Sequence, residues 1–221
     1  MLALSTVWGT SIVSKDRINN VKIDVLIDGA LKIVRNAQRL CDEAELLHKN
    51  QMYARSYALS HLAREEFAKS LMLYKVCIQV LCKAKVDWKK LDRRFRDHKE
   101  KVVNDRALTM MIFNNILKQK SDAIAPEVLF NRGTIDFTNN RKNQSLYVDW
   151  EKGKFVSPEE NFTERQSFRN LEIAKFRIGL VSRTIASLVQ LKELPIEEIK
   201  KVFPLDKIEQ EAKAFDEKHG A

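Results

Sequence analysis

The stretch that decides the fold is residues 54–71, which read ARSYALSHLAREEFAKSL. It contains neither Gly nor Pro, and its apolar residues recur at helical spacing, which predicts one uninterrupted helix. This pattern continues on both sides, so we predict a helix from Asn50, taken as the N-cap, to about Lys83. A similar pattern predicts an earlier helix that starts at about Arg17 or Asp24 and ends at about His48. Because so few residues separate the two helices, they should form an antiparallel hairpin.

The remainder of the chain also favours helices. Only 6 Gly and 4 Pro occur in 221 residues, fewer than β-rich or loop-rich folds use. We predict a third helix over about 87–118 and a fourth over about 163–194, whereas residues 119–162 lose the helical pattern. A short hairpin around Gly153 is expected there. The predicted fold class is all-α: an antiparallel helical bundle with a short irregular or hairpin insertion near residues 120–160.

The chain is predicted to be one domain with two appendages. Residues 1–16 are a tail that lacks the basic start of a secretory signal, 17–194 form the helical domain, and 195–221 hold short helices. No apolar stretch is long enough to suggest a transmembrane helix, so no membrane contact is expected. The three cysteines are odd in number and form no C-x-x-C pair, which favours a reducing, cytoplasmic location.

Charged residues fall inside the apolar arc of the second predicted helix. At 100° per residue, His61, Glu65 and Lys69 share the arc of Ala54 and Ala58. An ionised Glu65 facing a packed interior needs partners, and Lys69, four residues on, is the first candidate.

The third predicted helix offers further partners for Glu65. His98 lies at the edge of its apolar face, with Arg94 and Lys101 beside it. If the two apolar faces pack together, these residues and Glu65 form a half-buried cluster of a carboxylate, an imidazole and cations. We therefore predict that Glu65 is mostly buried and paired with Lys69 or with a basic residue of the third helix.

Two interpretations of this cluster are open. In the first it is an interhelical salt-bridge network around a core histidine. In the second it performs acid–base chemistry on a phosphodiester, with His98 moving the proton and Lys or Arg side chains stabilising the phosphate. We find no Gly-rich phosphate loop and no local metal-ligand motif, so neither a cofactor nor a metal is expected.

Charge is concentrated around the same segment. The net charge is +9, and residues 83–106 hold ten basic and five acidic side chains. Such a segment is typical of a nucleic-acid contact or of a well-solvated helix surface.

Three segments resemble one family. Residues 54–71 are similar to the "A, then A-x-E-E-x-x-K" helix of the AbiV family of abortive-infection proteins. Residues 95–101 (FRDHKEK) resemble its "F-R-x-H-K-x-K" segment, and residues 146–149 (LYVD) followed by residues 156–158 (VSP) form a third match.

The resemblance implies a HEPN-like helical core, of the kind that often forms dimeric ribonucleases in phage defence. It highlights Glu65, Glu66 and Lys69 on one helix and His98 and Lys101 on the next. HEPN ribonucleases also show an Arg, a polar residue and then a His, with four to six residues between the Arg and the His. Arg93 and His98 have four between them, although Arg94 lies nearer the His98 face of a straight helix.

The implied function is a phage-defence effector, either a metal-independent ribonuclease that acts as a toxin or a non-catalytic protein that blocks a phage or host protein by binding it. The candidate catalytic residues are Glu65, Lys69, Arg93, Arg94, His98 and Lys101. The candidate partners are RNA, a phage or host protein and a second copy of the chain in a homodimer.

Overall fold

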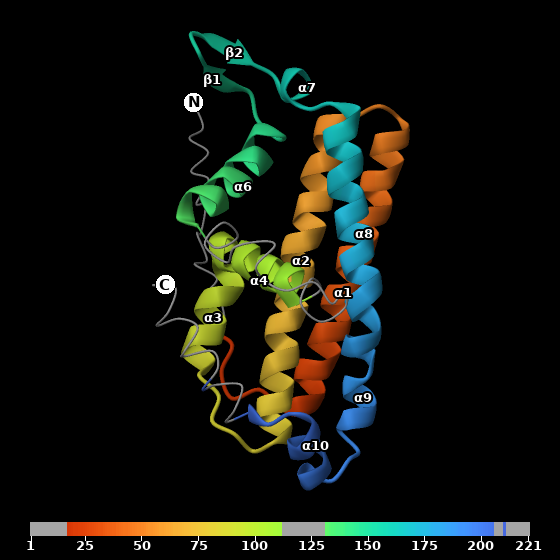
Figure 1. Cartoon of the computed structure of the whole chain (residues 1–221), viewed down its shortest axis with the longest axis vertical. Helices are drawn as coiled ribbons and strands as arrows, with labels where there is room; N and C mark the ends of the chain where they lie inside the picture. The colour runs from red at the N-terminus through yellow and green to blue at the C-terminus, as the bar shows by residue number, and fades with distance from the viewer. Residues whose placement is uncertain (1–16, 112–130, 206–209, 211–221) are drawn as a thin grey trace, which may run out of the picture.

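The two longest helices form the predicted hairpin. The computed structural model describes residues 17–111, 131–205 and 210. In it α1 (Ile23–Lys49) and α2 (Tyr53–Leu81) lie side by side (Figure 1). Asn50, however, ends α1 instead of starting α2, because its side-chain amide donates to the Leu46 carbonyl at 2.8 Å. The predicted N-cap is therefore wrong, and Met52 occupies that position without a side-chain cap.

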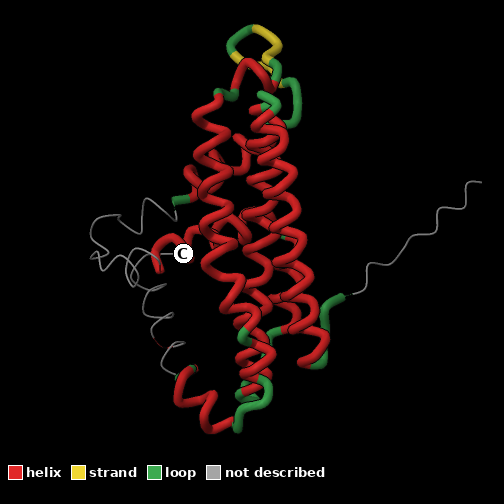
Figure 2. Tube along the Cα trace, turned by 90° about the vertical axis from the view of Figure 1, so that its right-hand side faces the viewer, coloured by secondary structure: helices red, strands yellow, loops and turns green. Residues whose placement is uncertain are grey.

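Helix α2 is the centre of the fold. It contacts α1 on one side and α8 (Glu164–Ala186) on another, so the three long helices run alongside one another (Figures 1 and 2). Small residues allow this close packing: Ser56, Ser60 and Ser70 are fully buried, as are several alanines. The Ser60 and Ser70 hydroxyls donate to carbonyls of their own helix, which removes the cost of burying them.

The predicted third helix is wrong as a single element, because it breaks at Asp97. Helix α3 covers Trp88–Arg96 and α4 covers His98–Met111. Asp97 has an extended backbone, and its carboxylate accepts the Lys99 N–H at 2.8 Å, as an N-cap residue does. His98 thereby becomes the first residue of α4, which runs across α2 instead of along α3 (Figure 1). The predicted continuation over 112–118 lies outside the described residues.

The insertion contains more structure than the sequence predicts. The hairpin is confirmed: β1 (Asp149–Glu151) pairs antiparallel with β2 (Lys154–Val156). Its turn residues, Lys152 and Gly153, both have positive φ, as a two-residue turn with the twist of a hairpin requires. Before it lies α6 (Arg132–Gln144), where irregular chain was expected. This polar helix is anchored to α4, because the Arg106 guanidinium of α4 donates hydrogen bonds to the Thr134 and Thr138 hydroxyls.

The C-terminal part follows the expected order. After α7 (Pro158–Asn161), the predicted start of α8 is confirmed by a capping box, in which Thr163 and Gln166 exchange hydrogen bonds. Helix α8 ends earlier than predicted, and α9 (Leu188–Leu191) and α10 (Ile196–Val202) follow. The all-α fold class is confirmed. None of the described helices has the length and apolar composition of a membrane span.

Candidate functional site

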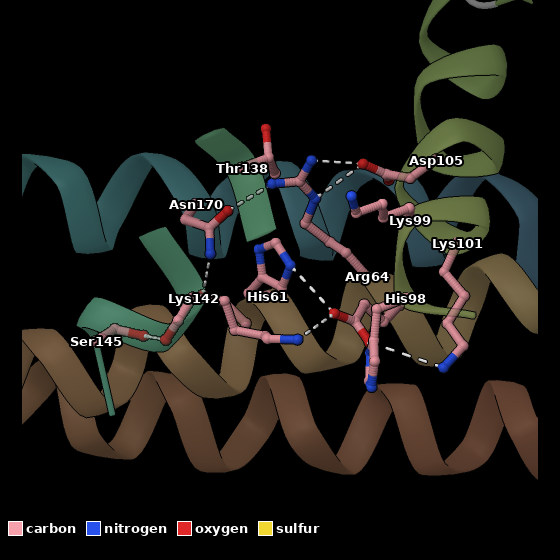
Figure 3. Close-up of polar contacts among 12 residues, drawn as sticks. His61, Arg64, His98, Lys99, Lys101, Asp105, Thr138, Lys142, Ser145 and Asn170 are labelled. Carbon is pink, nitrogen blue, oxygen red and sulfur yellow. Dashed lines mark hydrogen bonds and ion pairs between the residues drawn. The ribbon is translucent and has the colours of Figure 1, made fainter. Parts of the chain in front are cut away.

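The candidate site is centred on the Glu65 carboxylate of α2, whose partners belong to α2, α4 and α6. Figure 3 labels these partners: His61, His98, Lys101 and Lys142. The Glu65 residue is only 5% exposed. Its Oε2 lies 2.6 Å from Nδ1 of His98 in α4, and its Oε1 lies 3.0 Å from Nζ of Lys142 in α6. Two further groups approach it: Nζ of Lys101 at 3.9 Å and Nε2 of His61 at 3.4 Å. One carboxylate thus serves four basic side chains.

The charge state of this cluster follows from burial and proximity. Burial alone would raise the pKa of the Glu65 carboxyl, but its contacts with His61, His98 and Lys142 outweigh that effect and hold the pKa well below the ordinary 4.5. Burial lowers the pKa of His61 below 6.5, so this ring is neutral at pH 7. Burial also lowers the pKa of Lys101, although the nearby Glu65 charge opposes the shift. The cluster therefore depends on an ionised Glu65.

His98 differs from the other partners because it faces solvent. Its side chain is 54% exposed although Nδ1 contacts a buried carboxylate. An ionised carboxylate only accepts hydrogen bonds, so Nδ1 donates its hydrogen to Glu65, and in the neutral form of the ring Nε2 carries no hydrogen. Within the described residues Nε2 forms no hydrogen bond. The imidazole is thus held at one edge and accessible at the other.

Some of the predicted residues are brought together. Glu65, His98 and Lys101 meet as expected, and the predicted burial of Glu65 is confirmed. The predicted pairing with a basic residue of the third-helix segment is confirmed too, since His98 and Lys101 both belong to it.

Other predicted residues lie elsewhere. Lys69 pairs with Glu66 at 2.6 Å, although it is close enough to Lys101 to lower the pKa of that lysine. Arg94 donates to Glu100 at 2.9 Å. Arg93 is exposed and contacts neither Glu65 nor His98 in the described part of the chain.

Lys142 is the partner that sequence reasoning missed. It lies 77 positions after Glu65, in a helix that the apolar pattern does not reveal. Only 7% of Lys142 is exposed, so its ammonium is nearly as buried as the carboxylate that it contacts. A tertiary contact of this kind leaves no local signal in a single sequence.

A model of the family HEPN_AbiV, described as AbiV, matches residues 25–178. The chain belongs to the AbiV family. The match runs from α1 into α8 and includes Glu65, His98 and Lys142. No curated protein and no solved structure matches this chain. Membership of the family indicates a role in abortive infection, a form of phage defence.

A second buried network lies beside the first in this AbiV protein (Figure 3). Arg64 of α2 donates to Asp105 of α4 and, at 2.6 Å, to the Asn170 side chain of α8. Arg177 of α8 also donates to Asp105. Because the Asp105 carboxylate is shared by two arginines, their charges hold its pKa low despite burial, which alone would raise it. This network fixes the middle of α4, the helix that begins with His98, against α2 and α8.

Proposed function

We propose that this AbiV protein is an abortive-infection effector that arrests growth by cleaving RNA without a metal ion. The observation that carries the proposal is the exposed His98 ring hydrogen-bonded to the buried Glu65 carboxylate. A histidine that serves only to stabilise a core is buried, as His61 is. A histidine that transfers protons must be oriented on one side and reachable on the other.

The chemistry assigns separate roles to the cluster. The 2′-hydroxyl of RNA attacks the adjacent phosphorus, and the bond from phosphorus to the 5′-oxygen breaks. Nε2 of His98 takes the proton of the 2′-hydroxyl or, when protonated, gives one to the departing 5′-oxygen. Glu65 fixes the ring and compensates its positive charge when it is protonated, as a carboxylate does beside a catalytic histidine. Lys142 and Lys101 are positioning residues, because they contact Glu65 and are buried.

The phosphate needs positive charge near His98. Lys69 and Arg94 supply it from beside the cluster, where each is held by a glutamate. Cleavage with both an acid and a base needs a second proton carrier, and the segment from Arg93 to His98 supplies a single histidine. A homodimer that brings two copies of this cluster together across a two-fold axis meets that need.

The test compares His98→Ala with a matched histidine variant, His48→Gln. His48 is also partly exposed, but its Nδ1 contacts the Ser167 hydroxyl, 2.9 Å away, instead of a carboxylate. Growth arrest, phage plaque formation and total RNA integrity are followed in cells that express each protein. We expect His98→Ala to lose RNA cleavage and protection while leaving the fold largely intact, and His48→Gln to keep both activities. EDTA should leave cleavage by the purified protein unchanged. Protection by a folded His98→Ala protein would reject the catalytic proposal.

A second candidate function is protein binding through the hairpin. Trp150 and Phe155 face each other across the strands, yet they are 59% and 72% exposed, and Tyr147 and Val148 beside them are exposed as well. Such an apolar tip is typical of a protein contact. If the non-catalytic alternative holds, Trp150→Ser with Phe155→Ser abolishes protection while His98→Ala retains it.

A further inference from the structure

A groove is lined by residues of α2, of the segment that leads into α3, and of α3 itself. Figure 1 shows where these two helices lie. Its volume is about 750 Å³, within the range of ligand sites. Apolar side chains that are buried or partly buried form its floor: Leu71, Met72, Val76, Trp88 and Leu91. Trp88 is the aromatic member of this lining and lies at the start of α3.

The rim of the groove is strongly basic. Among the residues that the structure describes, five cationic side chains line it, against one acidic side chain, Asp87. Asp87 is already engaged as the N-cap of α3, where its carboxylate accepts the Lys90 N–H at 2.8 Å. The four lysines are exposed and form no ion pair within the described residues: Lys75, Lys85, Lys89 and Lys90. The groove therefore presents uncompensated positive charge around an apolar floor.

We propose that this groove binds single-stranded RNA, with phosphates on the rim lysines and a base stacked on Trp88. An apolar and aromatic floor with a cationic rim is the combination by which proteins hold single strands without reading their sequence. The inference rests on the proposed ribonuclease function and names the surface that holds its substrate.

The groove leads toward the candidate site. Leu71 is six residues after Glu65 on the same helix, about 9 Å along its axis. At the other wall Arg94 lines the groove and donates to Glu100, in the first turn of the helix that begins with His98. A strand lying in the groove thus reaches the neighbourhood of His98. This continuity favours RNA over an acidic amphipathic peptide, which would also fit the charge and the floor.

Binding is measured with the full chain and a fluorescein-labelled, 2′-O-methylated single-stranded RNA, by fluorescence anisotropy at several salt concentrations. The probe lacks the 2′-hydroxyl nucleophile, so the measurement does not depend on cleavage. Lys75→Gln/Lys85→Gln tests the rim, because these lysines come from α2 and from the segment before α3. The matched control is Lys152→Gln/Lys154→Gln, two exposed lysines of the hairpin.

The rim variant should make the negative slope of log K against log salt shallower by about 1.4, since each phosphate contact on a single strand contributes about −0.7. At 0.1 M salt such a change corresponds to about 25-fold weaker binding. Trp88→Leu keeps an apolar side chain but removes the ring, so it should weaken binding by roughly 5- to 150-fold and leave the salt slope unchanged. The hairpin control should bind as the wild type does. Melting temperatures identify any variant that has lost its fold, and Trp88→Met, which is also apolar and has no ring, replaces Trp88→Leu if the latter unfolds.

Wild-type affinity and salt slope in both the rim and the Trp88 variants would overturn the proposal. It is equally overturned if these variants lose binding of a helical Glu/Leu-rich peptide but not of RNA, which would make the groove a peptide site. A different result would reject the proposed function but not the groove. In that case RNA binding is weakened by the groove variants, while RNA cleavage in cells is unaffected by His98→Ala.

Discussion

Replacing Glu65 with Gln should destabilise the fold far more than the same replacement of Glu66, the other acidic residue of α2. Lys101 and Lys142 are 5% and 7% exposed, and both ammonium groups contact this carboxylate. Removing one partner of a buried ion pair costs about 3–5 kcal/mol. Because Gln keeps the volume and can accept one hydrogen bond, we expect the lower end, about 3 kcal/mol. In a chain of this size that loss lowers the melting temperature by about 6–12 °C.

The adjacent Glu66 provides the control. It pairs with Lys69 near the surface, so Glu66→Gln should cost no more than about 1 kcal/mol. The double variant Glu65→Gln/Lys142→Met removes the stranded ammonium and should recover part of the loss, which a double-mutant cycle quantifies. Thermal unfolding followed by circular dichroism measures all three. A Glu65→Gln protein that melts within about 2 °C of the wild type would refute the ion-pair reasoning.

The pH dependence of the Glu65 effect has a definite sign. The pKa of Glu65 in the folded protein lies below the ordinary value of 4.5, so the unfolded chain takes up a proton first as pH falls. The stabilisation is complete above about pH 4.5 and is lost below it, as the pH falls toward the folded pKa. The difference in melting temperature between wild type and Glu65→Gln should therefore narrow in acid. A difference that widens there would contradict the assigned charge state.

Three further predictions concern neighbouring residues. Burial lowers the pKa of His61 from 6.5, so wild-type stability should fall as pH drops below about 6.5. In His61→Gln the melting temperature should depend less on pH between neutral and mildly acid solution. Asp105→Asn removes the carboxylate that Arg64 and Arg177 share and should cost about 3–5 kcal/mol in urea unfolding; a cost below 1 kcal/mol would show that the network is not a stabilising contact. Asp97→Ala removes the N-cap of α4 and should cost about 1 kcal/mol, yet reduce RNA cleavage far more, because it releases the turn that aims the first residue of that helix.

The long helices were predictable because their signals are local and repeated. Apolar residues at helical spacing mark α1, α2 and α8, and α8 begins after Thr163, where the fourth helix was expected to start. The same reasoning identified Glu65, since a carboxylate in an apolar arc is conspicuous without any structure. The Gly153 hairpin was predicted for a similar reason, because only a few residue types suit its turn.

The sequence predictions fail where tertiary contacts, and not local patterns, determine the structure. Periodicity continues through Asp97, and nothing in the helical pattern distinguishes an acid on a solvated helix face from an N-cap that starts a new helix. Helix α6 has a polar composition with a weak apolar face, so its order depends on contacts such as those of Arg106 with Thr134 and Thr138. Lys142 was missed together with its helix.

Stability alone gives a poor account of the Glu65 cluster. A buried ion pair seldom stabilises a fold better than well-packed apolar residues of the same volume, and here one carboxylate must serve two buried lysines as well as two histidines. A stabilising core would gain by replacing these groups with Leu or Met, as the neighbouring Phe67 and Met72 positions illustrate. The cluster does, however, orient His98: Lys142 and Lys101 hold the Glu65 carboxylate in place, and this carboxylate holds the exposed ring of His98. An arrangement whose single accessible group is an oriented imidazole is costly for packing and well suited to proton transfer, and for that reason we favour the ribonuclease proposal over a purely structural role.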